Sequence, residues 1–386
     1  MTATAIDARE RLPALMEAAV RAPGDSKAHR QLAEALAHSG SLRAAIVHAL
    51  KAVELDERDP NALVTLGAAY MMTGQHAAAT EAYERALRLS PTHLVARWNY
   101  ALDRLLHGDW KRGWELFRGG GTPWNRRPIR TYLPAWDGKP LPEGSSLCLW
   151  FEAGLGDTLF FLRYCETARR ASRCHRLIVE AQEDLCGYIR DMPGIDAVYP
   201  RRDDWAMPEE CHHHAALMDV PGILGETLTG GRPYLPRPEV SRSDRFRVGA
   251  CWRGNPQHAR DAYRSMGHDD FDPIIIDGPE WVCLQKGHPL APPMPDIATT
   301  AGIIAGLDLV VTVDTMVAHL AAGMGVPTWI LLPVCNDWRW GVGRTDTPFY
   351  DCVRLYRQTE LGVWSDVVEH VRADLAVECR QRAGGG

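Results

Sequence analysis

A glycine-rich segment ending in a carboxylate follows the first strongly apolar run in the middle of the chain. The run covers residues 146–151, and Gly154, Gly156 and Asp157 follow it at the start of an amphipathic pattern. Two glycines let a ligand approach the backbone closely, and the start of a helix attracts anions. A tight strand-to-helix turn also needs glycine for steric reasons alone. Because the segment is not a full GxGxxG pattern, it does not predict a dinucleotide site.

A second polar segment follows the apolar run 247–252. Arg264 in this segment is a reasonable phosphate ligand, because a guanidinium group pairs with two phosphate oxygens at once. A surface arginine without a ligand is the alternative. The segment comprises Trp252, Arg253, Gly254, Asn255 and Pro256, followed by His258, Asp261, Arg264 and Ser265.

A third polar segment, Asp314 and Thr315, follows the apolar run 309–313, with His319 one helical turn further on. Asp and Thr are favoured capping residues, so we expect both to cap the helix that follows. The backbone amides of the next residues would then face a phosphate group. A helix cap without any ligand is the alternative for Asp314.

These three segments must be positioned by strands and helices that alternate along the chain. Such alternation favours parallel sheets, with each polar segment at the carboxyl end of a strand. The proline-rich stretch 232–238 predicts a linker between two half-domains, and hence a cleft between them. We expect strands at 146–151, 176–180, 195–199, 215–219, 247–252, 281–285, 309–313 and 328–332, and helices at 158–171, 296–306, 315–323 and 364–380.

The first third of the chain repeats with a period of 34 residues. Residues 60–93 fit a helix-turn-helix unit with Gly74 at its turn, and Gly40 and Gly108 lie in phase on either side. Small residues recur in phase too, and they let paired helices pack closely. Residues 8–118 therefore resemble the tetratricopeptide repeat (TPR) family, whose concave surface binds peptides or proteins. A generic helical bundle is the alternative.

Composition excludes several classes of protein. Hydrophobic residues make up 46% of the 386 residues and the net charge is -6, which argues against disorder and against a basic nucleic-acid-binding surface. No apolar run is long enough for a membrane-spanning helix, and we see no secretory signal. The ten cysteines include no Cys-x-x-Cys pair, so we expect reduced thiols in a cytoplasmic protein rather than disulfides or a zinc ribbon.

Two further motifs suggest metal binding but are interpreted otherwise. Residues 211–214 read Cys-His-His-His, and adjacent histidines seldom bind one ion together, so a loop or strand-edge role is expected. Asp270 and Asp272 form an Asp-x-Asp pair that follows no clear apolar strand, so chance is the better explanation. The sequence thus predicts no metal site.

Four ordered motifs, at residues 152–164, 251–265, 313–329 and 337–340, make the resemblance more specific. Together they resemble TPR-containing glycosyltransferases of the heptosyltransferase-like (family 9-like) group, with architectural similarity to TPR-linked O-GlcNAc transferases. The resemblance implies a GT-B architecture, in which two Rossmann-like α/β domains face a cleft, and inverting catalysis without a bound metal. One departure stands out: the family pattern is Glu-Gln-Gly-x-Gly-Asp, and Ala153 replaces the Gln, so an amide donor at the floor of the cleft is lost.

The resemblance also implies roles for individual residues. Asp157 would be the general base that deprotonates an acceptor hydroxyl. Arg264 would contact the diphosphate, Asp314 and Thr315 would hold the donor sugar and diphosphate, and His319 would support the same helix face. The full donor-binding set is Trp252, Gly254, Asn255, Arg264, Ser265, Gln285 (lining the nucleobase pocket), Asp314, Thr315, Met316 and His319, and Gly154, Gly156, Asp337 and Arg339 would contact sugar or acceptor.

The sequence therefore predicts a mixed all-α and α/β protein: a TPR domain (1–120), an acceptor-side Rossmann-like domain (121–240) and a nucleotide-sugar-binding Rossmann-like domain (241–386). We expect a bacterial glycosyltransferase that uses a nucleotide-sugar as co-substrate, needs no other cofactor, and modifies a protein presented by the repeats. Two alternatives remain. One is a lipopolysaccharide or capsule enzyme whose repeats bind a partner protein, and the other is a non-catalytic TPR protein with a degenerate sugar domain. Self-association through the ends of the repeat stack is left open.

Overall fold

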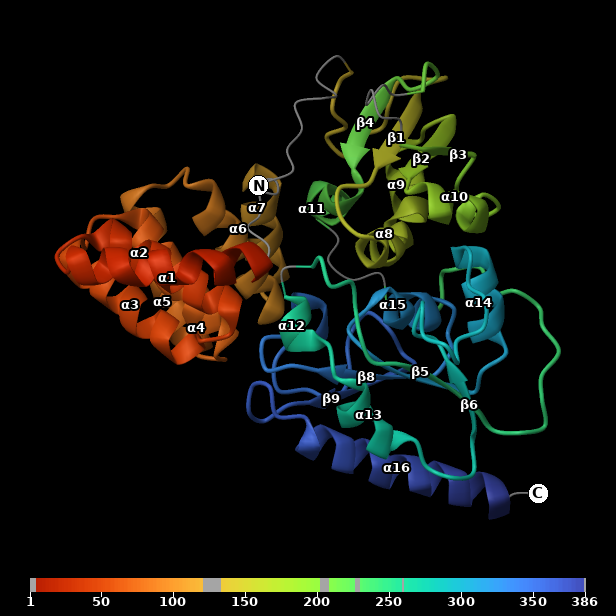
Figure 1. The fold of residues 1–386 in the computed structure, drawn as a ribbon. Helices are drawn as coiled ribbons and strands as arrows, with labels where there is room; N and C mark the ends of the chain where they lie inside the picture. Colours follow the sequence, from red (N-terminus) through yellow and green to blue (C-terminus); the bar gives the residue numbers. More distant parts are fainter. Residues whose placement is uncertain (1–4, 121–132, 202–207, 226–229, 259, 385–386) are drawn as a thin grey trace.

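The computed structural model describes residues 5–120, 133–201, 208–225, 230–258 and 260–384. Within these residues seven helices come first, followed by two sheets that lie one above the other in Figure 1, with the helices to one side. The helices are α1 (Ala5–Arg21), α2 (Ser26–Ser39), α3 (Leu42–Leu55), α4 (Pro60–Met72), α5 (His76–Leu89), α6 (Leu94–Leu106) and α7 (Trp110–Gly120).

The helices form a stack of antiparallel pairs because the same devices recur every repeat. Gly40, Gly74 and Gly108 each have positive φ at the turn between two paired helices, a conformation that other residues rarely adopt. Asp25 and Asp59 cap the first helix of successive pairs by accepting from the backbone N–H groups of residues 27 and 61. The helical-repeat prediction is confirmed.

Both sheets are parallel throughout, as predicted. The first has the order β3-β2-β1-β4, with helices α8 (Leu155–Phe161), α9 (Cys165–Ser172), α10 (Glu183–Ile189) and α11 (Val220–Leu224) between or after its strands. Its strands are β1 (Ser146–Trp150), β2 (Arg176–Ala181), β3 (Ala197–Pro200) and β4 (His213–Ala216).

The second sheet has the order β6-β5-β7-β8-β9, and helices cover both of its faces. Its strands are β5 (Arg247–Cys251), β6 (Glu280–Cys283), β7 (Leu309–Val313), β8 (Thr328–Leu332) and β9 (Val353–Arg357). The helices are α12 (Asp261–Arg264), α13 (His268–Phe271), α14 (Ile297–Ala305), α15 (Met316–Gly323) and α16 (Ser365–Gly384), and the 3-10 turns of the two sheet domains are η1 (Leu162–Tyr164), η2 (Leu217–Asp219), η3 (Asp272–Ile274) and η4 (Trp338–Trp340).

Strand β9 was not expected from the sequence. Two of its five residues, Arg354 and Arg357, are arginines, so its apolar signal is weak. Arg354 lies over the rings of Trp329 and Tyr356, and this contact keeps the charged side chain on the sheet surface. Elsewhere the strand ends differ from expectation by a few residues, as at β6, which ends at Cys283 rather than at residue 285.

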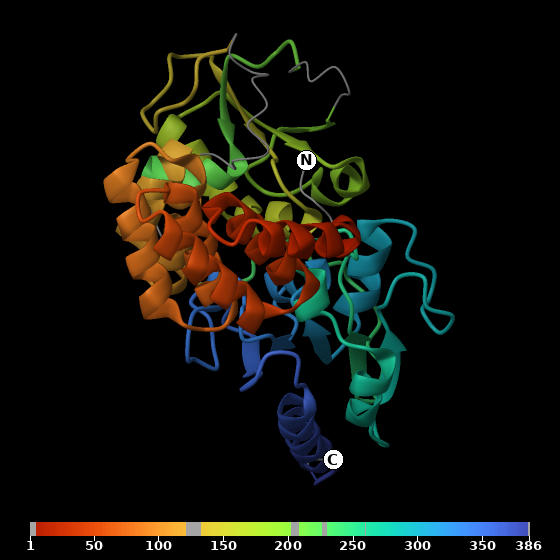
Figure 2. The same ribbon diagram turned by 60° about the vertical axis from the view of Figure 1, so that its left-hand side comes forward.

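An aromatic cluster joins the repeats to both sheet domains. Trp114 on α7 lies 6.4 Å from Phe161 on α8 and 5.6 Å from Trp338 in η4, between ring centroids. Trp110 contacts Trp338 and Phe349 in the same way. These tryptophans pack the last repeat helix against both sheet domains, and Figure 2 shows the repeat helices lying alongside both sheets.

The domain limits inferred from the sequence remain a prediction. The limit after residue 120 lies beside residues 121–132, which are outside the described residues. The limit after residue 240 lies in the connection between α11 and β5. None of the described helices is both long and apolar enough to cross a membrane.

Candidate active site

A cavity of about 790 Å³ lies between the two sheet domains. Residues 154–157 after β1 and Asp184 on α10 line it from the first domain. The second domain contributes residues that follow β5, β6, β7 and β8. The carboxyl ends of parallel strands therefore meet at one place, as the sequence predicted.

Nearly all the site residues predicted from the sequence line this cavity. They are Gly154, Gly156, Asp157, Gly254, Asn255, Arg264, Gln285, Asp314, Thr315, Met316, His319, Asp337 and Arg339. Trp252 and Ser265 do not line the cavity, but pack behind residues that do. Trp252 packs against Phe271, and the Ser265 hydroxyl accepts a hydrogen bond of 2.9 Å from the Gly254 amide. Both residues are thus placed to support the loop that lines the cavity.

Helices α8 and α15 approach each other at the cavity. A side-chain carbon added at Gly156 would lie only 3.1 Å from Cδ2 of His319, so the glycine permits this close approach. Thr315 caps α15 by accepting from the Val317 amide. Asp314 does not cap the helix, contrary to expectation, because residue 315 already occupies the capping position and turns the preceding carboxylate toward His319 Nε2, at 3.9 Å.

An ion-pair network crosses from one domain to the other. Arg339 in η4 is almost fully buried and donates to Oδ1 of Asp157 at 2.6 Å and to Oδ1 of Asp337 at 2.8 Å. Burial alone lowers the pKa of Arg339, but Asp337, Asp157 and Asp314 together raise it above its usual value. Asp157 also accepts through Oδ2 from the Gly154 amide, so both of its oxygens are held in place.

Burial sets the charge of two further groups. It raises the pKa of Asp314 to about 6, with a further contribution from Asp337. It lowers the pKa of His319, as do the neighbouring Arg339, Arg163 and Arg264, so this imidazole is neutral at pH 7. His319 also bonds through Nδ1 to the Tyr350 hydroxyl at 2.9 Å, which fits its expected supporting role.

The wall opposite Asp157 carries an excess of positive groups. Arg264 is fixed there by Asp261 and by the Asp314 carbonyl, at 3.2 and 3.0 Å. Sequence reasoning did not single out Arg253, Arg260 and Lys286, which also line the cavity. Among the described residues no carboxylate forms an ion pair with these three. Their position directly after predicted strands, or in the loop before Arg264, was the available signal.

The other predicted features have ordinary structural roles. Residues 211–214 lie at and before β4, an edge strand, where His212 accepts from the Ser146 amide and His214 from the Trp150 indole. Asp270 lies in α13 and accepts from the Gly267 amide. Next to Ala153, the side-chain amide of Gln182 donates to the Ala153 carbonyl at 3.0 Å, so an amide group does lie beside this position.

Comparison with known proteins identifies one repeat unit by sequence and finds distant likenesses in structure. Residues 60–93 match the tetratricopeptide repeat family model. One similar structure is a mutant of the O-GlcNAc transferase from Thermobaculum terrenum, with 14% identity over 98% of this chain and 89% of that chain and a TM-score of 0.39. Another is the glycosyl transferase family 9 from Veillonella parvula, with 10% identity over 63% of this chain and 99% of that chain and a TM-score of 0.43. The structure of MamA from Desulfovibrio magneticus RS-1 is also similar, with 23% identity over 30% of this chain and 64% of that chain and a TM-score of 0.27. The chain thus spans less than two thirds of that repeat protein. No curated protein matches the sequence.

Proposed function

We propose that this protein is a glycosyltransferase that moves a sugar from a nucleotide-sugar donor to a hydroxyl group. One observation carries the proposal. A single cavity brings Asp157 of the first sheet domain opposite the loops and the helix start of the second, whose residue types suit a diphosphate. The order of the four sequence motifs supports the same function.

The donor would bind to the second domain. Arg253, Arg260 and Lys286 offer positive charge to phosphate oxygens, and the start of α15 offers the backbone amide of Met316. Gly254 allows close backbone approach, since even one added carbon there would lie 2.6 Å from Arg264 Nη2. These groups would stabilise the leaving diphosphate without a metal ion.

Asp157 would act as general base in a single displacement that inverts the anomeric centre. In that reaction the acceptor oxygen attacks the sugar carbon, the bond to the diphosphate breaks, and Asp157 takes the hydroxyl proton. Arg339, which belongs to the second domain, would be a positioning residue for this carboxylate, since its Nη2 donates to Asp157 Oδ1 at 2.6 Å.

A protein acceptor is favoured by the place of the repeats. The Tyr263 hydroxyl, on a cavity-lining residue, donates to the Ala37 carbonyl of α2, and the turn at Gly74 lies against Val334. A polypeptide held by the repeat array would therefore lie close to the cavity. In the alternative, the acceptor is a saccharide and the repeats hold a partner protein.

A thermal-shift screen against UDP, GDP, ADP, CMP and dTDP, each with and without an attached sugar, tests donor binding. A ligand at 100 times its Kd stabilises the folded state by about 2.7 kcal/mol, so one nucleotide should raise the Tm by several degrees. A flat response to all of them would favour a degenerate sugar domain and contradict the proposal.

A further inference from the structure

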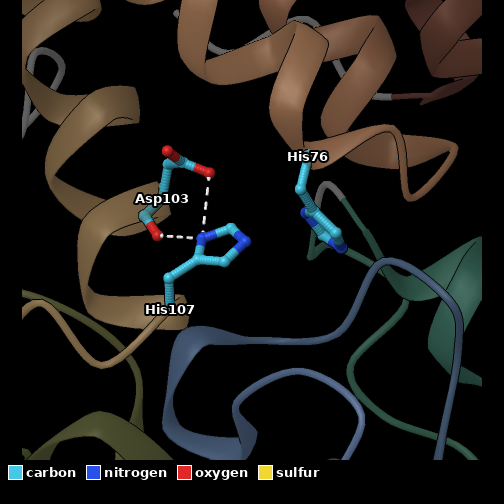
Figure 3. A group of neighbouring side chains, drawn as sticks. All are labelled: His76, Asp103 and His107. Carbon is cyan, nitrogen blue, oxygen red and sulfur yellow. Dashed lines mark hydrogen bonds and ion pairs between the residues drawn. The ribbon is translucent and has the colours of Figure 1, made fainter.

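The repeat domain contains a second cluster of chemically capable side chains, away from the cavity. His76 is the first residue of α5, Asp103 lies on α6, and His107 caps the C-terminal end of α6. One ligand atom from each lies within 4.8 Å of the other two. Figure 3 shows the three side chains converging between the two helices.

Asp103 is the least expected member of this cluster. It is fully buried, and its Oδ2 accepts from the Thr80 hydroxyl and from Arg104. Its Oδ1 is also buried and lies 3.4 Å from His107 Nδ1, but it has no hydrogen-bond partner in the part of the chain that the structure describes. A buried carboxylate oxygen without a partner costs free energy, so we expect a bound group to interact with Asp103 Oδ1.

The histidines complete a set of donors around that oxygen. His107 Nδ1 bonds to the Asp103 carbonyl at 2.8 Å, and because a carbonyl only accepts, Nδ1 carries the proton and Nε2 keeps its lone pair. Metal-binding histidines usually have their other ring nitrogen held in this way. The Nδ1 of His76 is buried without a hydrogen-bond partner.

The repeat fold itself does not need these residues. One repeat of 34 residues earlier, the positions of Asp103, His107 and His76 hold Ala69, Thr73 and Leu42. The same helix packing is thus achieved there with small or apolar side chains. The polar cluster is an addition to this one repeat.

We propose that His76, Asp103 and His107 bind one Zn²⁺ ion. Two imidazole nitrogens and one carboxylate oxygen are a common donor set for zinc, and a water molecule would complete a tetrahedral site. Bonds of about 2.1 Å bring donors to about 3.4 Å apart, so the present spacing needs a small closure. The partly exposed His76 supplies it by rotation, while Arg104 holds Asp103 and the Asp103 carbonyl holds His107.

The ion would link α5 to α6 where the repeats meet the second sheet domain. The carbonyl of Leu106, beside His107, faces Gly341, and the turn before His76 faces Val334. Val334 and Gly341 lie on either side of Arg339 in the sequence. The ion would therefore join the two repeat helices at a place separate from the cavity that holds Asp157.

Zinc binding to the full-length protein, first stripped with a chelator, tests the proposal. Equilibrium dialysis with metal analysis should give one tightly bound Zn²⁺ per chain. Loss of a residue that only hydrogen-bonds a zinc ligand weakens zinc affinity by about 10- to 100-fold. Loss of a ligand itself, in His76→Gln or His107→Gln, should therefore raise the Kd for Zn²⁺ at least tenfold. Both side chains are partly exposed, so these variants should fold, which circular dichroism checks.

His38→Gln is the matched control. His38 also bonds through Nδ1 to a carbonyl four residues earlier, at the end of α2, but belongs to no such cluster among the described residues. It should bind zinc like the wild type. Co²⁺ in place of Zn²⁺ should give a visible spectrum without a thiolate charge-transfer band, which separates this site from the cysteines. Equal affinity in the wild type and both cluster variants, or no tight binding at all, would overturn the proposal and leave a bound water as the occupant.

Discussion

At the scale of single residues, the cavity combines groups whose charges depend on one another. Arg339 is buried between Asp157 and Asp337, while the Asp314 carboxylate lies beside His319 and has no lysine or arginine at hydrogen-bonding distance among the described side chains. Removing one partner of a buried ion pair usually costs several kcal/mol. The network therefore fixes the position of Asp157 relative to the second domain.

The raised pKa of Asp314 predicts a dependence of stability on pH. Its pKa is about 6 in the folded protein and near 3.8 when unfolded, so the folded state binds the proton more tightly. This contribution is fully present below about pH 4 and is lost as the pH rises through 6. Relative to Asp314→Asn, the wild type should lose up to about 3 kcal/mol of unfolding free energy between pH 4 and pH 7.

Urea unfolding of both proteins across this range measures the difference. The asparagine variant keeps the size of the side chain and removes only the titration. A difference between the two proteins that stays constant from pH 4 to pH 7 would show that Asp314 titrates normally.

At the scale of elements, the loop after β5 depends on a glycine for its packing. A carbon added at Gly254 would lie 2.6 Å from both Arg264 Nη2 and Asp261 Oδ1. Gly254→Ala should therefore displace the guanidinium and weaken nucleotide binding by about tenfold, which corresponds to about 1.4 kcal/mol. Titration calorimetry with the nucleotide found by thermal shift measures this change.

Gly187→Ala is the control for that substitution. Gly187 lies in α10 with open space around it, and alanine favours a helix by about 0.5–1 kcal/mol. This variant should bind the nucleotide normally and be slightly more stable. Unchanged binding in Gly254→Ala would mean that the loop has room to adjust.

Much of the element order could be predicted from the sequence, for physical reasons that differ between segments. The repeats were visible because each turn needs a glycine in the same phase, as at Gly40, Gly74 and Gly108. The central strands were visible as short apolar runs buried on both faces. Strand β9, at the edge of the second sheet, was not predicted, because Arg354 and Arg357 interrupt its apolar run.

The side-chain contacts of the site could not be predicted in the same way. Strand ends placed Asp157 and Asp314 at one cleft, but nothing in the sequence shows that Arg339 bridges Asp157 and Asp337. The cluster of His76, Asp103 and His107 was missed because its members are 27 and 4 residues apart, with spacing that only the pairing of two repeat helices explains.

At the scale of the whole molecule, the repeats and the two sheet domains share one continuous core. Trp114 is 3% exposed and contacts Phe161 of the first domain and Trp338 of the second. Trp114→Ala should cost about 3–5 kcal/mol, as large core truncations do, and should loosen the repeats from both domains. Limited proteolysis should then release a repeat fragment that the wild type retains.

Trp98→Ala, inside the repeat stack, serves as the comparison. Trp98 contacts Phe117 within the repeats, so its loss should destabilise the stack itself rather than its attachment. Identical proteolysis of Trp114→Ala and the wild type would mean that other contacts hold the domains together.

The most direct test of the proposed function is donor turnover with and without the Asp157 carboxylate. Release of nucleoside diphosphate from the donor identified by thermal shift is measured with a cell extract as source of acceptor. Asp157→Asn should keep the nucleotide-induced shift but lose about 10²- to 10⁴-fold in turnover, while Glu183→Gln, exposed on nearby α10, should react like the wild type. Equal turnover by Asp157→Asn and the wild type would contradict the account.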